Sequence, residues 1–139
     1  MDRRTFLATA SVTGIVAIAG CFEGTPDYDV GMTIDSFRPE SLTVEPNSTV
    51  TFLNTSSHSH NVVAFQDDYP EAAEYWSSDE KQEISSEQEA IDDWYSREQR
   101  TRLGQGDSFE YTFEHPGRYG YYCVPHIEAD MTGEIIVEE

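Results

Sequence analysis

Basic side chains are scarce in this sequence. Its 139 residues include 27 Asp and Glu but only 8 Lys and Arg, so the formal net charge is −19. Nucleic-acid binding needs clustered Lys and Arg to neutralise phosphates, and we therefore expect no nucleic acid partner. The acidity favours a solvated surface suited to high salt, where screening suppresses self-repulsion. A cationic partner is the alternative interpretation.

Cysteine is equally scarce, because Cys21 and Cys123 are the only two. Two thiols exclude a disulfide-rich scaffold, although one disulfide would suit an exported protein. Each thiol has a better assignment, since Cys21 ends an N-terminal signal and Cys123 belongs to a metal-binding motif. We therefore expect the two cysteines not to pair.

A membrane-spanning run is absent from the N-terminus. The apolar and small residues at 8–20 are too few, because crossing a bilayer takes about 20 apolar residues. Arg3 and Arg4 precede this stretch, which is typical of a twin-arginine export signal. Residues 18–21 resemble a lipobox, in which the cysteine is lipidated.

From these features we expect residues 1–20 to be a twin-arginine lipoprotein signal peptide and Cys21 to carry a lipid. Residues 21–31 hold Gly, Pro and acids without periodicity, and they are predicted to form a flexible acidic tether. The exported protein would then be lipid-anchored to the outer face of the cytoplasmic membrane. Alternatively, Cys21 is a small apolar residue in a signal that is cleaved elsewhere.

Histidine and methionine are also few, yet metal donors gather near the C-terminus. Cys123, His126 and Met131 lie within nine residues, so one loop could wrap all three around one ion. Thiolate and thioether are soft ligands that favour Cu(I), and imidazole also suits Cu(II). His60 would complete the set. The sequence therefore predicts one Cu(I)/Cu(II) ion held by His60, Cys123, His126 and Met131.

Other interpretations of these donors remain open. Taken singly, a His is usually solvated or hydrogen-bonded, a Met usually fills the core, and a buried Cys often behaves as a small apolar residue. Their joint occurrence at this spacing favours copper. Zinc could bind the same set, although structural zinc sites are typically built from Cys and His alone. His58 lies two residues from His60 and could compete as a ligand.

Short alternating segments separated by turns predict an all-β sandwich within a single domain at residues 32–139. The expected strands lie at residues 32–37, 42–44, 50–52, 60–65, 107–113, 118–123 and 133–138. Turns are expected at residues 46–48 and 116–117. Asn47-Ser48-Thr49 and Asn54-Thr55-Ser56 also fit the N-glycosylation pattern, which is common by chance.

The central segment, at about residues 66–105, contains no strand candidate. Ser86 and Glu89 have the spacing of a capping box, after which Ile91, Trp94 and Tyr95 fall on one helical face. Residues 71–76 allow a second, shorter helix. We expect a helical insert held to the sandwich through Trp76, Ile91 and Trp94. Its alternative role is an arm that contacts a partner.

Two motifs carry a resemblance to a known family. Residues 120–126, Gly-Tyr-Tyr-Cys-Val-Pro-His, and residues 131–137, Met-Thr-Gly-Glu-Ile-Ile-Val, resemble plastocyanin and halocyanin, which are type 1 (blue) copper proteins. The stretches at 37–39, 42–44, 49–54 and 60–63 follow in the order that this family uses. The ligand loop departs from the family at residues 127–130, which lack the usual glycines.

The resemblance implies a cupredoxin-like Greek-key β-sandwich with a short helical insertion. It implies that His60, Cys123 and His126 form the copper plane and that Met131 is the weak axial ligand. Asn61 matches a residue whose backbone N–H binds the cysteine sulfur. Tyr122 matches a tyrosine used as an electron route, and its alternative role is packing.

The function implied is a monomeric, membrane-tethered electron carrier without enzymatic activity. Its partners would be redox proteins, mainly membrane complexes, that donate and accept single electrons. A copper-trafficking or storage protein is the first alternative. A copper enzyme would need an open coordination position or further metal centres, whereas the chain holds only four histidines.

Overall fold

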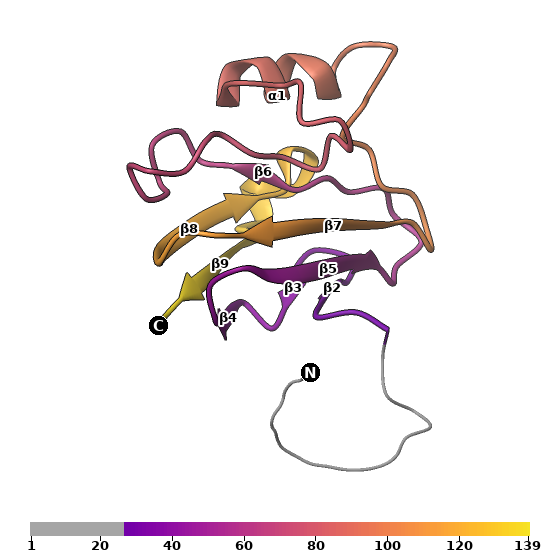
Figure 1. Ribbon diagram of the computed structural model, residues 1–139. Helices are drawn as coiled ribbons and strands as arrows, with labels where there is room; N and C mark the ends of the chain where they lie inside the picture. Colours follow the sequence, from indigo (N-terminus) through magenta and orange to yellow (C-terminus); the bar gives the residue numbers. More distant parts are fainter. Residues whose placement is uncertain (1–26) are drawn as a thin grey trace.

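The computed structural model describes residues 27–139 and forms two four-stranded sheets (Figure 1). The first sheet contains, in spatial order, β3 (Phe37–Arg38), β2 (Val30–Met32), β5 (Ser48–Asn54) and β7 (Ser108–Phe113). The second contains β4 (Ser41–Val44), β9 (Thr132–Val137), β8 (Gly117–Tyr122) and β6 (Val63–Ala64). The predicted all-β class is therefore confirmed.

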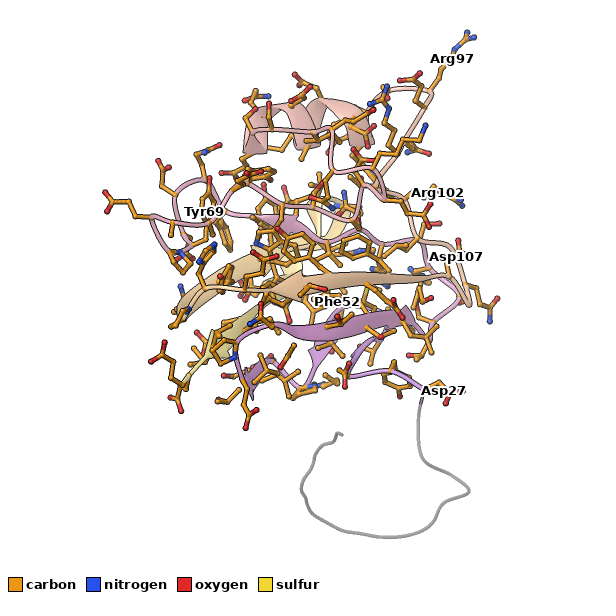
Figure 2. The ribbon with its side chains drawn as sticks, in the orientation of Figure 1. Asp27, Phe52, Tyr69, Arg97, Arg102 and Asp107 are labelled. Carbon is orange, nitrogen blue, oxygen red and sulfur yellow. The ribbon has the colours of Figure 1, made fainter. Side chains whose placement is uncertain are left out.

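The core lies between the two sheets, as alternation along the strands requires. In β5, Val50 and Phe52 are buried while their neighbours are more exposed. Phe52 packs edge-on against Tyr121 of β8 with ring centroids 5.4 Å apart, and Figure 2 shows Phe52 in the middle of the sandwich. β2 pairs in parallel with β5, and β4 pairs in parallel with β9.

Most predicted strands match observed ones, but the strand predicted at residues 32–37 is wrong. The chain forms two short antiparallel strands there, β2 and β3, with a turn between them. Thr33 closes this turn, because its N–H donates to the Ser36 carbonyl at 2.9 Å. Ile34, which the alternation assigned to the strand, is 56% exposed.

The domain also begins earlier than predicted. Val30 and Gly31, assigned to the end of the tether, pair with Phe52 and Leu53 of β5. Val30 is fully buried, and burial of this apolar side chain favours its inclusion in the sheet. The predicted signal at residues 1–20, most of the tether and the lipidation candidate Cys21 lie outside the described residues.

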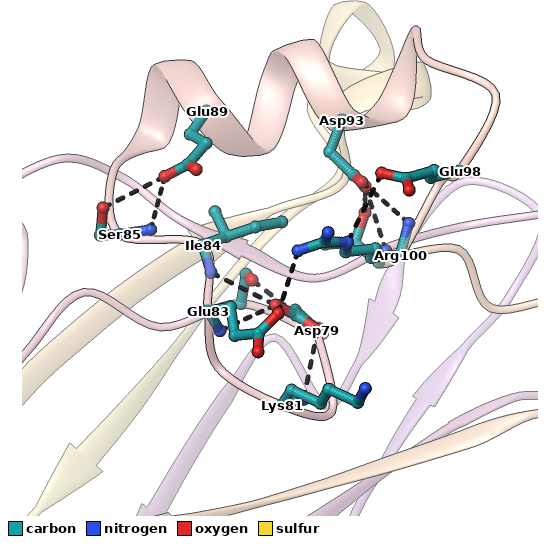
Figure 3. Close-up of polar contacts among 11 residues, drawn as sticks. Asp79, Lys81, Glu83, Ile84, Ser85, Glu89, Asp93, Glu98 and Arg100 are labelled. Carbon is teal, nitrogen blue, oxygen red and sulfur yellow. Dashed lines mark hydrogen bonds and ion pairs between the residues drawn. The ribbon is translucent and has the colours of Figure 1, made fainter.

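The insert contains one helix, α1 (Glu87–Trp94), which lies beyond β6 in Figure 1. The N-cap half of the predicted capping box is present, since the Ser86 hydroxyl accepts from Glu89 N–H at 3.2 Å. The Glu89 carboxylate in turn accepts from the Ser85 N–H, as Figure 3 shows. Tyr95 is 75% exposed and ends the helix, so the prediction that it shares the apolar face is wrong.

The second helix predicted at residues 71–76 is absent from the described chain. A single turn closes at Ala73, and the chain then extends so that Trp76 enters the core. Its carbonyl accepts from Ala64 N–H at 3.2 Å, which ties the insert to β6. Trp76 is fully buried, and its ring centroid lies 5.1 Å from those of Tyr111 and Phe113. It therefore anchors the insert, as predicted.

Candidate metal centre

The C-terminal loop brings three of the predicted ligands to one end of the second sheet. Cys123 follows β8 and precedes the 3₁₀ segment η1 (Val124–Ala129), which contains His126. Cys123 N–H donates to the Met131 carbonyl at 3.1 Å, and Met131 N–H donates to the His126 carbonyl at 3.3 Å. Asp130 adopts a left-handed conformation that reverses the chain toward β9.

His60 reaches the same place from a segment just before β6. It forms an isolated bridge with Leu103, in which each residue donates its N–H to the other's carbonyl at 2.7–3.0 Å. The sequence predicted a continuous strand over residues 60–65, whereas the structure pairs only Val63 and Ala64 with β8. The bridge to Leu103 therefore fixes His60 independently of that strand pairing.

Three donor atoms form a small, nearly equilateral triangle. The Nδ1 atoms of His60 and His126 are 3.2 Å apart, and Cys123 Sγ lies 3.5 Å and 3.4 Å from them, respectively. The point equidistant from all three is about 2 Å from each atom, near the roughly 2.0–2.3 Å of metal bonds to imidazole and thiolate. The donor set thus fits a metal ion in its plane.

Burial and hydrogen bonding prepare His60 as a ligand. His60 is fully buried, and its Nε2 lies 3.0 Å from the Ser56 hydroxyl. That hydroxyl donates to Asn54 Oδ1, so it accepts the proton carried by Nε2. The lone pair of Nδ1 is therefore left facing Cys123. A partner on the outer nitrogen of this kind orients metal-binding imidazoles.

The site favours uncharged groups while no cation is bound. Burial, followed by repulsion from His126, lowers the pKa of His60 to about 4. Burial also lowers the pKa of His126 and raises the pKa of the Cys123 thiol to about 12. A coordinating cation displaces the thiol proton, so metal binding offsets the cost of burying the thiolate.

Acid should destabilise the metal-free protein as the pH falls from about 6.5 to about 4. The unfolded chain protonates His60 near the ordinary pKa of 6.5, whereas the folded protein resists until about 4. The unfolded state then binds more protons, and up to about 3 kcal/mol of stability is lost across this window. Urea midpoints at about pH 7 and pH 5 measure the loss. His60→Gln should largely remove the difference, and an undiminished difference would contradict the assignment.

Asn61 joins the two ligand segments. Its backbone N–H lowers the pKa of the Cys123 thiol, against the larger raising effect of burial. Its side-chain oxygen accepts from Val124 N–H at 2.8 Å. Asn61 therefore connects the residue after His60 with the residue after Cys123.

Tyr122 lies beneath the insert. It is only 4% exposed, its ring is 4.4 Å from that of Phe65, and its hydroxyl donates to Glu87 of α1 at 2.7 Å. Burial and the neighbouring Glu87 carboxylate raise its pKa. Tyr122 therefore has almost no solvent-exposed surface, which bears on both roles considered for it, packing and electron transfer.

His58 does not join the compact donor set of the described residues. Its side chain is exposed, and its ring centroid is 6.1 Å from that of His126. The ligand atoms of His60, Cys123 and His126 all lie within 4.8 Å of one another. His58 therefore lies at the exposed edge of the site, near His126.

The buried polar residues that support His60 were not predicted from the sequence. Asn54 is fully buried, and its amide nitrogen donates to the His58 and Leu103 carbonyls at 2.6 Å and 2.8 Å. Asn54-Thr55-Ser56 matches a glycosylation pattern, but this burial leaves the Asn54 amide no access to a glycan. The useful signal was the pair of short polar residues, Asn54 and Ser56, just ahead of a histidine.

Comparison with known proteins gives the same picture. The model of the copper-binding plastocyanin/azurin family matches residues 27–138. Plastocyanin from Scenedesmus fuscus is 30% identical over 116 residues, covering 81% of this chain and 100% of that protein. Chloroplast plastocyanin from Chlamydomonas reinhardtii is 29% identical over 135 residues, covering 93% and 81%, respectively.

Solved structures share the fold. A pseudoazurin from Sinorhizobium superposes with a TM-score of 0.54 at 25% identity, covering 79% of this chain and 72% of its own. A purple cupredoxin from Nitrosopumilus maritimus gives a TM-score of 0.52 at 22% identity, covering 79% and 100%, respectively. The two sheets described above are thus those of a cupredoxin.

Proposed function

Because the chain belongs to the plastocyanin/azurin family of copper-binding proteins, we propose that it is a type 1 copper protein carrying single electrons between redox partners. The triangle formed by His60, Cys123 and His126 carries this proposal, since its size suits one ion. Two imidazoles and a thiolate with a weak axial thioether suit both oxidation states of copper.

The protein's part in this function is to hold its ligands still. His60, Cys123 and His126 are proposed as the plane, and Met131, fully buried at the end of the loop, as the axial ligand. When bound, copper supplies the one-electron couple. The bonds that fix His60 and the ligand loop in the metal-free protein keep the donors in place, so a change of charge moves them little.

Burial of the ligands also helps to distinguish an electron carrier from a protein that delivers copper. His60, Cys123 and Met131 are fully buried, and only His126 is partly exposed. A trafficking protein must release its ion to a partner, for which accessible donors are better suited. This arrangement favours the carrier over the trafficking or storage alternative.

The half-exposed edge of His126 is the proposed route for electrons. Tyr122, the other route that the family resemblance implied, is covered by α1 and bonded to Glu87. A partner therefore cannot touch the Tyr122 ring directly, whereas it can approach His126. Exposed Ile127 lies next to His126 and adds apolar surface there.

The proposed setting is the outer face of the cytoplasmic membrane, with membrane redox complexes as partners. The support is the twin-arginine pattern and the lipobox-like residues 18–21. In residues 27–139, no helix is long and apolar enough to cross a bilayer. Cys21→Ser should move the expressed protein from the membrane fraction to the soluble fraction, and unchanged membrane retention would remove the lipid anchor from the proposal.

Reconstitution with Cu(II) tests the proposed function directly. A type 1 centre should give an intense blue colour and a narrow copper hyperfine splitting in electron paramagnetic resonance. Spectroelectrochemical titration should then show reversible one-electron reduction. A pale protein with an ordinary tetragonal spectrum, or one that cannot be reduced reversibly, would overturn the proposal.

A further inference from the structure

The end of the insert lies against the segment that carries His60. Leu103 and His60 exchange two backbone hydrogen bonds, and Thr101, two residues earlier, is fully buried. The carbonyl of Thr101 accepts from the Ser78 hydroxyl at 2.7 Å, and that hydroxyl in turn accepts from Val62 N–H at 3.0 Å. The insert is therefore built into the support of the metal site.

A continuous chain of hydrogen bonds runs from the ligand loop into this insert. Val124 N–H donates to Asn61 Oδ1 at 2.8 Å, and Asn61 Nδ2 donates to the Thr101 hydroxyl at 3.1 Å. The Thr101 hydroxyl donates to Asp93 Oδ2 at 3.0 Å. Asp93 belongs to α1, so three bonds connect the helix to the residue that follows Cys123.

The groups at the two ends of this hydrogen-bond series, the Val124 N–H and the Asp93 carboxylate, determine which partner donates in each bond. The Val124 N–H can only donate, which makes Asn61 accept through its oxygen and present its NH₂ group to Thr101. The Thr101 hydroxyl then accepts from Asn61 and must donate its own proton elsewhere. The Asp93 carboxylate only accepts, so it completes the chain without an unsatisfied group.

Asp93 is the fixed point of this arrangement. Its carboxylate also accepts from the backbone N–H groups of Arg100 and Thr101 at 2.9 Å and 3.1 Å, and Figure 3 shows it pointing from α1 toward Arg100. Hydrogen bonds to a carboxylate are roughly twice as strong as neutral ones. Asp93 thereby restrains both the backbone and the side chain of Thr101.

We propose that Asp93 is a positioning residue for the copper centre, acting through Thr101 and Asn61. This inference rests on the proposed function. By fixing the Asn61 side chain, the chain of bonds holds the ligand loop at Val124 and keeps the Asn61 N–H directed at the Cys123 sulfur. Hydrogen bonds to a ligand sulfur withdraw electron density, so they favour Cu(I) and raise the reduction potential.

The proposal and a simple charge effect predict opposite changes in the reduction potential. Removing a carboxylate near the site weakens the stabilisation of the more positive Cu(II) form, which alone would raise the potential. Breaking the bond chain loosens the N–H to sulfur contact and lowers the potential. Asp93→Ala removes the acceptor of the Thr101 hydroxyl and should therefore lower the potential, whereas Asp92→Ala removes the same charge one residue away and should not. Asp92 is exposed, and its carboxylate accepts from the Gln88 amide at 3.0 Å.

Thr101→Val is the charge-neutral test, because it keeps the side-chain shape and removes only the hydroxyl. In the copper-loaded protein we expect about a tenfold shift of the Cu(I)/Cu(II) equilibrium toward Cu(II), which is about 59 mV for one electron. Thr101→Ser should restore the wild-type potential. A merely structural role would lower the urea midpoint of Thr101→Val and leave its potential unchanged.

Spectroelectrochemical titration of wild type and the four variants decides the matter. An unchanged potential in Thr101→Val, or equal potentials in Asp93→Ala and Asp92→Ala, would overturn the proposal. If Thr101→Val does not fold, the Asp93 and Asp92 pair still decides, because both lie on the outer helix. A wild-type protein that forms no reversible blue centre would instead refute the proposed function.

Discussion

Cys123→Ser is expected to abolish the blue colour and the reversible one-electron reduction completely. Cys123 is fully buried and contributes one corner of the donor triangle, 3.4–3.5 Å from both imidazoles. A serine hydroxyl is a hard donor that stays protonated near neutral pH, so it neither supplies the thiolate nor favours Cu(I). The loss should be total, because no other cysteine is available in residues 27–139.

Met131→Leu provides the contrast to this result. Leucine keeps the buried volume of Met131 and removes only the thioether, and such swaps usually cost less than about 1.5 kcal/mol in stability. A weak axial ligand tunes the potential rather than creating the colour. The variant should stay blue with a shifted potential. If both variants behaved alike in spectroelectrochemistry, the proposed ligand roles would be wrong.

Trp76→Ala should cost about 3–5 kcal/mol of the free energy of unfolding, the range found for truncating large buried aromatic residues. Trp76 is fully buried, stacks on Tyr111 and meets Phe113 and Tyr121 edge-on. Truncation leaves a cavity at the centre of the sandwich and removes the anchor of the insert. Urea unfolding of the metal-free protein measures the change.

Two variants control this measurement. Tyr95→Ala removes an aromatic side chain from the same insert, but Tyr95 is 75% exposed and the change should stay within about 0.5 kcal/mol. Trp76→Phe keeps a ring and removes the Nε1–H, which has no hydrogen-bond partner in residues 27–139. It should cost less than alanine, since an unsatisfied buried donor is lost. Equal losses for Tyr95→Ala and Trp76→Ala would refute the anchoring role.

The two loop donors of the triangle could be predicted because their information is local, since Cys123 and His126 share one loop. His60 lies 63 residues from Cys123 and was assigned from the ordered family motifs, and the strand that forms within the predicted range 60–65 does not include it. Helix α1 was likewise predictable, since its capping box is a short-range signal and Ser86 does bond Glu89. Features that depend on residues close together in the sequence could thus be predicted.

The features that could not be predicted depend on contacts distant in sequence. Asn61 and Thr101 bond across 40 residues, and nothing adjacent to either residue indicates that pairing. Trp76 follows a segment of good helix formers, yet burial among Phe52, Tyr111 and Phe113 overrides that propensity. The split of residues 30–38 into two strands likewise reflects pairing of β2 with β5.

The helix covering Tyr122 has a kinetic consequence for a carrier of the proposed kind. With α1 and Glu87 over this ring, a reductant and an oxidant would have to visit the His126 face in turn. A ternary complex is then excluded, each partner inhibits the other competitively, and turnover follows a ping-pong scheme. Fast dissociation, rather than tight docking, would set the throughput of such a shuttle.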